Sequence, residues 1–386
     1  MSLGALAFGG GAAVEHDTAP LRAEVRQFLA GQQAAGRFQP HCDAWLSGHD
    51  PEFSRELGRR GWIGLNWPSR YGGRDRPEIE RYAITEELLA AGAPVSAHWI
   101  AQRQSGPLLL RFGTEQQRER FLPAIANGEC YFAICMSEPD AGSDLAAATT
   151  RATRVDGGWS VTGRKVWTSH AHRSHYAILF CRTAPPSENR HAGFSQFILD
   201  LNAPGVTVRP IRLLTGEAHF NEVTFDEVFI PDELVVGEVG NGWLQVTSEL
   251  GYERSGPERF MSPLPLLLAW LGSLTPSPEP ADAELLGRLA ARLWSLRQLS
   301  LAVTAGLQRG DDVATQAALV KDLGTAFEQA SIEAIRAAVG REPDPSSRDT
   351  VEMLLAQAIA SAPGFTLRGG TNEILRGIVA RALGVR

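Results

Sequence analysis

The first third of the chain carries apolar residues at the three- and four-residue spacing of one helix face. This spacing predicts helices near residues 21–29 and 78–91. Thr114 is expected to open another helix, because Gln117 lies three residues later and completes a capping-box pattern. The segment 61–73 holds a proline and many glycines, so we expect a loop there. The pattern therefore predicts an N-terminal helical domain.

The pattern changes to alternation in the middle of the chain. Runs at 149–155 and 159–166 alternate on either side of a glycine-containing turn, which predicts a hairpin. Further strands are expected at 176–181, 194–200 and 223–230. Several short strands separated by turns indicate a small β-barrel or sandwich.

Helical spacing returns after Gly242. Leucines at 285–301 follow it, and two more helices are expected at 314–339 and 351–360. The segment 261–280 is rich in proline, leucine and serine, so we expect a loop or a broken helix there. The fold class is therefore expected to be α+β. Its expected parts are a flexible N-terminus (1–17), a helical domain (18–128), a β-domain (129–237) and a C-terminal helical bundle (238–386).

Composition narrows the classes of function. The 386 residues are 44% hydrophobic and 21% charged, as in an ordinary globular protein. A net charge of −7 without a basic stripe argues against nucleic-acid binding. The four cysteines lack metal-ligand spacing, so we expect no metal site. We expect neither a signal peptide nor a membrane-spanning stretch, and we expect a cytoplasmic protein.

The most distinctive chemistry lies where an apolar run ends at Ser137. The residues that follow, up to Asp144, form a turn rich in small and polar side chains. Hydroxyls and backbone N–H groups at a strand end can hold a polar ring or a phosphate, and they can equally form a capped turn. Trp167–Ser169, at the end of the predicted hairpin, allows the same two interpretations, a cofactor wall or ordinary packing.

Six motifs occur together in an order and at a spacing that resemble one family. They are Trp67–Gly73, Gly113–Pro123, Met136–Asp144, Gly163–Thr168, Val228–Pro231 and Gly370–Arg376. On these motifs the chain resembles the acyl-CoA dehydrogenase family from about residue 18 to the C-terminus. The family fold has an N-terminal helical domain, a central β-domain and a C-terminal four-helix bundle. These are the three parts that the residue pattern predicts.

The resemblance implies an enzyme with FAD as its cofactor. In the family, a carboxylate removes the α-proton of an acyl-CoA thioester while the β-hydride passes to flavin N5. An electron-transfer flavoprotein is the implied redox partner. By motif, the flavin-contacting residues are Met136, Ser137, Trp167, Thr168 and Ser169, with Gly142 and Ser143 in the adjoining loop. Thr371 and Glu373 are assigned to the FAD adenosine and pyrophosphate, and Ser143 and Arg254 to the acyl-CoA.

The catalytic base needs a separate argument. The commonest family position is Gly369 here, which has no acid but keeps the backbone N–H that helps hold the thioester oxygen in the family. Some members place a glutamate just after the β-domain, and Glu253 stands there on an apolar stripe, where an acid is costly unless paired or used. In the alternative interpretation Glu253 is paired with Arg254 or Arg259, or solvated at a helix end. Glu258 is the other candidate base.

Two departures from the family pattern concern the cofactor of a neighbouring subunit. A family segment that reaches the partner's FAD is replaced by Pro276–Pro280, and a glycine-rich loop is replaced by Val339–Ser346. An aspartate often found before the base is Gly251. The chain thus resembles one subunit of the heteromeric acyl-CoA dehydrogenases of steroid side-chain breakdown. We expect weak FAD retention when the chain is expressed alone.

Three functions remain open at this point. The first is an acyl-CoA dehydrogenase, or its base-bearing subunit, in a homodimer, homotetramer or heterotetramer. The second is a non-catalytic partner subunit, and the third is an oxidase or hydroxylase of the same family. A nicotinamide enzyme is disfavoured, because no strand–Gly-x-Gly-x-x-Gly–helix unit is present and the glycine run at 8–12 lies near the terminus.

Overall fold

The computed structural model describes residues 17–385 and divides into two compact units. The expected flexible segment 1–17 lies outside the described residues, apart from its last residue, and the side chains of residues 250–253 also lie outside them. The sheet unit comprises residues 49–75 and 95–250. The helical unit comprises the described residues of 1–48, 76–94 and 251–386.

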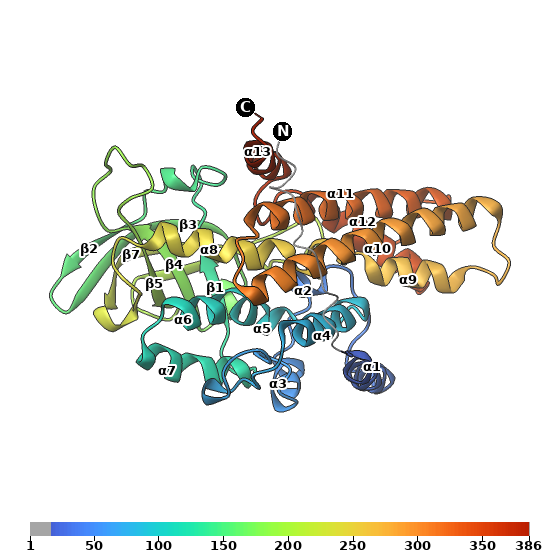
Figure 1. Ribbon diagram of the computed structural model, residues 1–386, viewed down its shortest axis with the longest axis horizontal. Helices are drawn as coiled ribbons and strands as arrows, with labels where there is room; N and C mark the ends of the chain where they lie inside the picture. The colour runs from blue at the N-terminus through green and yellow to red at the C-terminus, as the bar shows by residue number, and fades with distance from the viewer. Residues whose placement is uncertain (1–16, 386) are drawn as a thin grey trace. The chain divides into compact units, whose positions relative to one another are not determined.

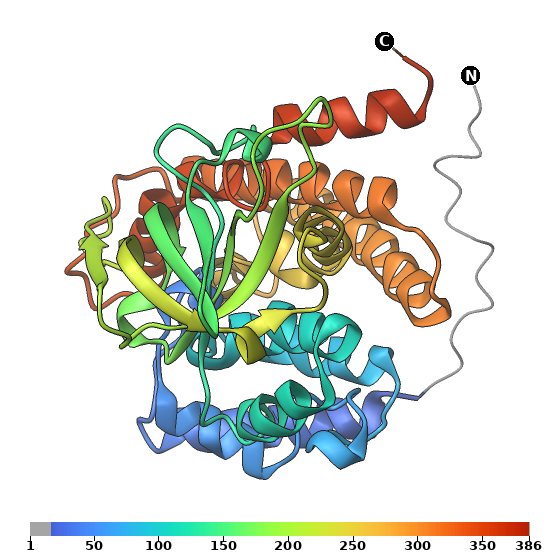
Figure 2. The ribbon, with the colours of Figure 1, turned by 90° about the vertical axis from the view of Figure 1, so that its left-hand side faces the viewer.

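The sheet unit is built on one eight-stranded sheet within the described residues. The strands are β1 (Phe132–Cys135), β2 (Arg151–Val155), β3 (Gly158–Ser169), β4 (Tyr176–Arg182), β5 (Phe194–Asp200), β6 (Val206–Ile211), β7 (Phe220–Pro231) and β8 (Val235–Val236). Their order is β6-β7-β3-β2-β4-β5-β8, and β1 pairs in parallel with β4. Figure 1 labels these strands, and Figure 2 shows their curvature.

The strand predictions are largely confirmed. β2 and β3 form the expected antiparallel hairpin, and β4, β5 and β7 cover the three further predicted strands. β6 was not expected, because it is short, contains Pro210 and has no buried residue, so its sequence gives little strand signal. It lies at the edge of the sheet, where a proline is tolerated.

Helices adjoin the sheet in the same unit. They are α3 (Pro51–Arg59), α5 (Ser96–Ile100), α6 (Gly106–Phe112) and α7 (Glu115–Ala126), with a π-helical segment at Ala101–Ser105. The capping box at the start of α7 is confirmed, since the Thr114 hydroxyl accepts from the N–H of Gln117, and the Gln117 side chain accepts from the N–H of Thr114. The Gln117 amide also donates to the carbonyls of Glu233 (2.8 Å) and Val235 (2.7 Å), so it joins α7 to β8.

The glycine-rich segment 61–73 is a loop, as expected, closed around the buried ring of Trp67. A Cβ atom at Gly64 or Gly106 would lie 2.6 or 2.2 Å from atoms of that ring, and one at Gly73 would lie 2.1 Å from the Trp67 carbonyl. Short 3₁₀ turns complete the chain at Ser69–Tyr71, Leu145–Ala147, Ala171–Arg173, Asp232–Leu234 and Pro257–Arg259.

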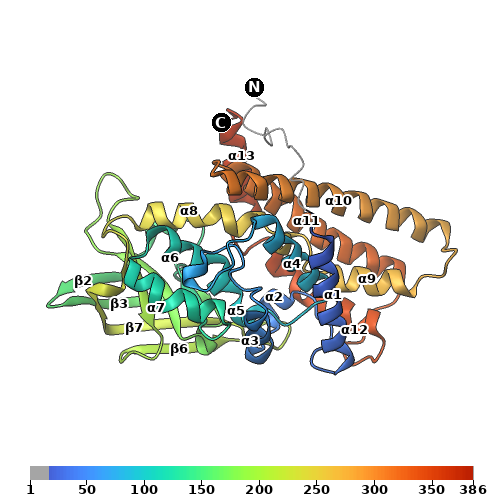
Figure 3. The ribbon, with the colours of Figure 1, turned by 60° about the horizontal axis from the view of Figure 1, so that its bottom comes forward.

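The helical unit draws its helices from both ends of the chain. They are α1 (Ala19–Ala34), α2 (Ala44–Ser47), α4 (Glu78–Ala90), α9 (Leu264–Ser273), α10 (Pro280–Arg309), α11 (Ala314–Val339), α12 (Thr350–Phe365) and α13 (Asn372–Ala382). Helix α8 (Gly242–Ser255) begins in the sheet unit and ends in the helical unit. Helices α10, α11 and α12 run side by side (Figures 1 and 3).

The segment 261–280 contains a regular helix where a loop or broken helix was expected. Pro265 falls in the first turn of α9, where the missing N–H costs nothing, and Leu266, Leu267 and Trp270 are buried. Proline content alone was therefore misleading, because the position of proline in a helix decides its effect.

Ion pairs join α1, α4 and α10. Arg22 and Arg26 pair with Glu87 at 2.9 and 2.7 Å, and Arg297 pairs with Glu86 at 2.7 Å. These residues line a cavity of about 190 Å³ that contains none of the predicted site residues. Among the described helices, none is long and apolar enough to cross a membrane.

Candidate functional site

The residues assigned to the flavin ring come from two segments that lie together in the sheet unit. We call Met136–Ser137 and Trp167–Ser169 the flavin-ring segments. The N–H of Val166 donates to the carbonyl of Ser137 at 2.9 Å, and the Thr168 hydroxyl donates to the Cys135 sulfur at 3.7 Å. The parallel pairing of β1 with β4 and the length of β3 bring these residues side by side, although about thirty positions separate them in sequence.

Trp167 stands at an interruption of the sheet. β3 pairs with β7 at Lys165–Val223 and again at Thr168–Asn221, so β3 holds one extra residue between them. This bulge puts Trp167 at a positive φ of 61°, with 55% of the residue exposed. Bulges and strained backbone positions cluster at binding sites.

The surroundings of Trp167 fit a flat aromatic group. The Asn221 amide donates to the Thr168 carbonyl at 2.9 Å and fixes the strand after the bulge. The indole meets Phe220 edge-on at 6.0 Å between ring centroids and keeps much of its surface in solvent. The exposed indole offers a stacking surface to a flavin ring, and the half-buried hydroxyl residues Ser137, whose carbonyl accepts from the N–H of Val166, and Ser169 offer polar contacts.

Gly142 and Ser143 lie in an exposed loop after β1. A Cβ at Gly142 would meet no atom within 4 Å, so packing within the described chain does not require glycine there. Asp144, the next residue, pairs with Arg190 at 2.6 Å.

The helical unit holds the second group of predicted residues around one turn. We call residues 366–371 the glycine turn, in which Gly369 and Gly370 have φ values of 71° and 92°. The Arg254 guanidinium donates to the Gly369 carbonyl at 3.2 Å, and Lys321 donates to the Gly370 carbonyl at 2.7 Å. A Cβ at Gly369 would lie 2.8 Å from the Arg259 guanidinium, so glycine suits both the backbone angle and the space.

The glycine turn leads into α13, where Thr371 and Glu373 lie. The Thr371 hydroxyl accepts from the N–H of Ile374 at 3.4 Å and caps the helix. The exposed Glu373 carboxyl accepts from the Glu373 backbone N–H and from the Thr371 hydroxyl. These two hydrogen bonds hold the pKa of the carboxyl below its usual value. The N-terminus of a helix favours negative charge, which suits the predicted contact with FAD.

The candidate bases stand near one another in sequence but in different surroundings. Glu253 lies in α8, and its side chain is outside the described residues, so the structure leaves its role as a prediction. Its neighbour Arg254 touches the Gly369 carbonyl. Glu258 is buried, and its charge acts on Arg81 of α4.

Sequence reasoning assigned no role to three buried residues that hold these segments. Lys165 donates to the Met136 carbonyl, Asn221 to the Thr168 carbonyl, and Lys321 to the glycine turn. Lys165 and Lys321 could have been noticed, because they are the only two lysines of the sequence. Asn221 gave no such signal, because only the fold brings it to the bulge.

Three family models match most of the chain. Models of the acyl-CoA dehydrogenase N-terminal, middle and C-terminal domains match residues 15–129, 133–228 and 275–384. The chain belongs to the acyl-CoA dehydrogenase family, an oxidoreductase family of flavoproteins.

Two similar curated relatives are from Mycobacterium tuberculosis. Acyl-CoA dehydrogenase FadE29 is 33% identical, with 93% of this chain and 94% of the relative covered. Acyl-CoA dehydrogenase FadE34 is 35% identical over 86% of this chain, which spans only 46% of that longer protein.

Solved structures share the fold over nearly the whole chain. The Tcur3481–Tcur3483 steroid acyl-CoA dehydrogenase has a TM-score of 0.85 and 29% identity, covering 98% of this chain and 99% of that one. The ChsE4–ChsE5 complex from Mycobacterium tuberculosis has a TM-score of 0.80 and 26% identity, covering 97% and 99%. The expected three-part fold is thereby confirmed.

Proposed function

We propose that this chain carries out FAD-dependent α,β-dehydrogenation of an acyl-CoA thioester, with Glu253 as the base. We further propose that it works with an unlike homologous subunit. The observation that carries the proposal is the glycine turn, in which backbone angle and space both favour glycine at the position of the usual family base. An acid from another element is then required, and Glu253 directly precedes the residue that binds the Gly369 carbonyl.

The chain's own residues divide the work as follows. The Glu253 carboxylate removes the α-proton, and the Gly369 N–H donates to the thioester oxygen as negative charge develops there. The flavin-ring segments would hold the flavin through the Trp167 indole and the hydroxyls of Ser137 and Ser169. Thr168 is completely buried and its hydroxyl donates to the Cys135 sulfur, so Thr168 would support this surface from within. FAD, when bound, would be the oxidant that accepts the β-hydride. Thr371 and Glu373, at the start of α13, would lie near its adenosine and pyrophosphate.

A heteromer is supported by the connections between the C-terminal helices. Residues 274–279 join α9 to α10 directly, and residues 340–349 join α11 to α12. These connections replace the segments with which family members reach a partner's FAD. Two of the similar structures are described as the Tcur3481–Tcur3483 steroid enzyme and the ChsE4–ChsE5 complex. We therefore propose a steroid side-chain acyl-CoA as substrate and an electron-transfer flavoprotein as electron acceptor.

The second candidate is a non-catalytic subunit that completes a partner's site. The same missing segments favour it, since a chain that lacks part of one site can still support another.

Anaerobic reduction of bound flavin by acyl-CoA tests the catalytic role. Replacing the base, Glu253→Gln, is expected to slow flavin reduction by about 10²–10⁴-fold while acyl-CoA binding is retained. The matched variant Glu258→Gln, five residues further on, is expected to keep most of the rate.

The outcomes separate the alternatives. Loss of reduction in Glu258→Gln alone would make Glu258 the base. If the heteromer keeps full activity with Glu253→Gln and also with Glu258→Gln, the proposal is contradicted and the non-catalytic subunit is favoured.

A further inference from the structure

The chain contains only two lysines, Lys165 and Lys321, against 35 arginines. Both side chains are completely buried, with 0% exposure. Lys165 lies at the flavin-ring segments of the sheet unit, and Lys321 lies at the glycine turn of the helical unit. A buried cation costs free energy unless its charge and donors are used, so both positions need an explanation.

Lys165 joins the two flavin-ring segments. Its ammonium group donates to the Met136 carbonyl at 2.8 Å and to the Glu138 carboxylate at 2.9 Å. Lys165 is also the last residue of β3 that pairs regularly with β7 before the bulge at Trp167. One side chain thus fixes Met136 and the strand position from which Trp167 is presented.

Glu138 extends this anchor to the loop that follows β1. Its carboxylate accepts from the N–H and hydroxyl of Thr149, at 2.7 and 2.8 Å, and from the N–H of Thr150 at 2.9 Å. Burial would raise the pKa of this carboxyl, but the Lys165 charge and these donors outweigh burial and lower the pKa to about 2. The loop 138–150 is therefore closed by an ionised carboxylate over the whole physiological pH range.

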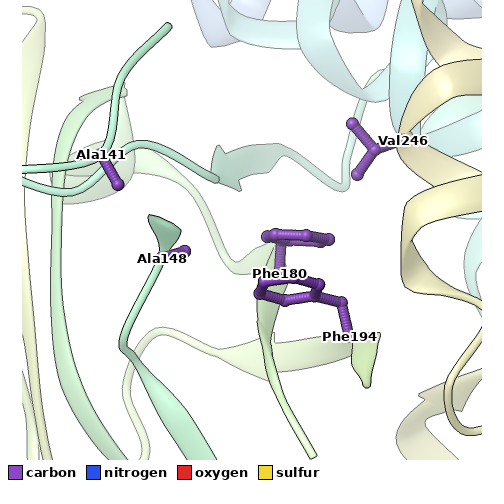
Figure 4. Close-up of a cluster of buried hydrophobic side chains, with 5 residues drawn as sticks. All are labelled: Ala141, Ala148, Phe180, Phe194 and Val246. Carbon is purple, nitrogen blue, oxygen red and sulfur yellow. The ribbon is translucent and has the colours of Figure 1, made fainter. Parts of the chain in front are cut away.

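Apolar contacts also hold this loop. Its residues Ala141 and Ala148 belong to a buried cluster with Val246 and the stacked rings of Phe180 and Phe194 (Figure 4). The Lys165 ammonium lies 5.7 Å from the centre of the Phe180 ring. The buried ion pair of Lys165 and Glu138 therefore lies beside this apolar cluster.

Lys321 has the corresponding position under the glycine turn. Its ammonium group donates to the carbonyls of Thr366 (3.3 Å) and Gly370 (2.7 Å) and to the Asn372 side chain (2.9 Å). The Thr325 hydroxyl donates to the same Asn372 oxygen at 3.1 Å. Lys321 thus holds the beginning and the end of the turn and the first residue of α13.

The chemistry of lysine explains why arginine does not occupy these two positions. An ammonium group directs three donors from one compact nitrogen, so it can reach oxygens that converge from different directions. A guanidinium is planar and larger, and it suits bidentate partners. Around the ammonium nitrogens of Lys165 and Lys321, most of the acceptors are single carbonyl oxygens that come from different residues.

We propose that Lys165 and Lys321 are positioning residues, one for the flavin-ring segments and one for the glycine turn, and that each requires an ammonium group rather than any cation. The assignment of these segments to flavin and thioester rests on the proposed function. The geometry of the lysines does not depend on it.

Charge-conserving variants provide the test, in the full chain and in the oligomer in which the wild type retains FAD. The variants are Lys165→Arg and Lys321→Arg. The matched controls are Arg154→Lys and Arg336→Lys, which swap lysine and arginine at exposed ion pairs of the same two units. Arg154 pairs with Asp232, and Arg336 pairs with Glu333. Hydrogen exchange is measured without FAD, and FAD affinity and flavin reduction are measured with it.

We expect each lysine to control its own segment. Lys165→Arg should speed exchange in peptides covering both 136–150 and 166–169 and raise the FAD dissociation constant at least about tenfold. Lys321→Arg should speed exchange at 366–372 and lower kcat by about 10²-fold with little change in KM, because small misplacement of a catalytic donor costs about that much. The controls should match the wild type.

Two results would overturn the inference. In the first, both arginine variants keep the hydrogen exchange, the FAD affinity and the kcat of the wild type. In the second, exchange becomes faster over a whole unit, as in general destabilisation. If an arginine variant does not fold, Glu138→Gln or Asn372→Ala keeps the lysine and removes one acceptor. The same peptides must then exchange faster, and wild-type exchange in them would contradict the proposal. A wild type that binds FAD without oxidising any acyl-CoA would refute the proposed function while leaving the exchange result to decide this inference.

Discussion

Glu328 is a buried carboxyl in α11 whose surroundings satisfy only one of its oxygens. Oε1 accepts from the N–H of Ser262 at 2.8 Å, and within the described residues Oε2 has no hydrogen-bond partner. Burial raises the pKa to about 7, against the opposing effect of the Arg368 charge. The neutral acid is therefore the form that the fold favours.

This raised pKa makes stability depend on pH in a definite direction. The pKa of the folded state lies above the unfolded value, so the contribution is complete below about pH 4.5 and is lost as pH rises through 7. We expect the free energy of unfolding of the wild type to lose about 2.5 kcal/mol from this group between pH 5 and pH 8. Glu328→Gln should remove that loss.

Denaturant unfolding at several pH values measures the effect. Glu333→Gln, on the same helix but exposed, is the matched control and should keep the wild-type slope. An unchanged slope in Glu328→Gln would show that the carboxyl is already ionised in the fold.

At the scale of elements, Gln117 ties α7 to β8 as well as capping its own helix. The side chain is buried, and its amide serves the carbonyls of Glu233 and Val235. Gln117→Leu should lower the free energy of unfolding by about 2–3 kcal/mol, because it leaves the buried Val235 carbonyl and the partly buried Glu233 carbonyl without this donor. Thr114→Ala removes only the cap and should cost about 1 kcal/mol. Thermal and denaturant unfolding of the two variants compare these costs, and equal losses would mean that the α7–β8 link contributes little.

The elements themselves were predictable where local pattern decides. The hairpin β2–β3 and helices α4, α7 and α11 follow from alternation, capping and helical spacing. Helix α9 and strand β6 were missed, because a proline in the first helical turn and a mostly exposed edge strand weaken those local signals.

The candidate site was predictable in a different way. Motifs singled out Met136–Ser137 and Trp167–Ser169, and their assignment to a flavin ring stays a prediction. The bulge at Trp167 and the lysine contacts depend on pairing between distant strands and helices. Such contacts are set by tertiary packing and leave no periodic trace in the sequence. The role of Glu253 as the base stays a prediction, because its side chain lies outside the described residues.

At the scale of the whole molecule, cofactor content separates the proposed assemblies. In the proposed heteromer this chain lacks the segments that reach a partner's FAD, so that proposal predicts well under one FAD per chain when this protein is purified alone. Coexpression with an unlike homologue should raise the content to about one per complete site. Absorbance in the flavin bands, with FAD quantified after denaturation, gives the ratio. One FAD per chain in a pure homo-oligomer would contradict the heteromer.

The division of the chain into units also fixes an order of events during synthesis. The helical unit combines residues 17–48 and 76–94 with residues beyond 250. Helices α1 and α4 therefore leave the ribosome long before α10, to which Arg22, Glu86 and Arg297 connect them. The sheet unit contains no residue after 250, so it can fold before the residues that pack against α1 and α4 beyond position 250 have been synthesised. During synthesis the nascent chain thus passes through a stage in which α1 and α4 lack the residues beyond 250 that complete their unit.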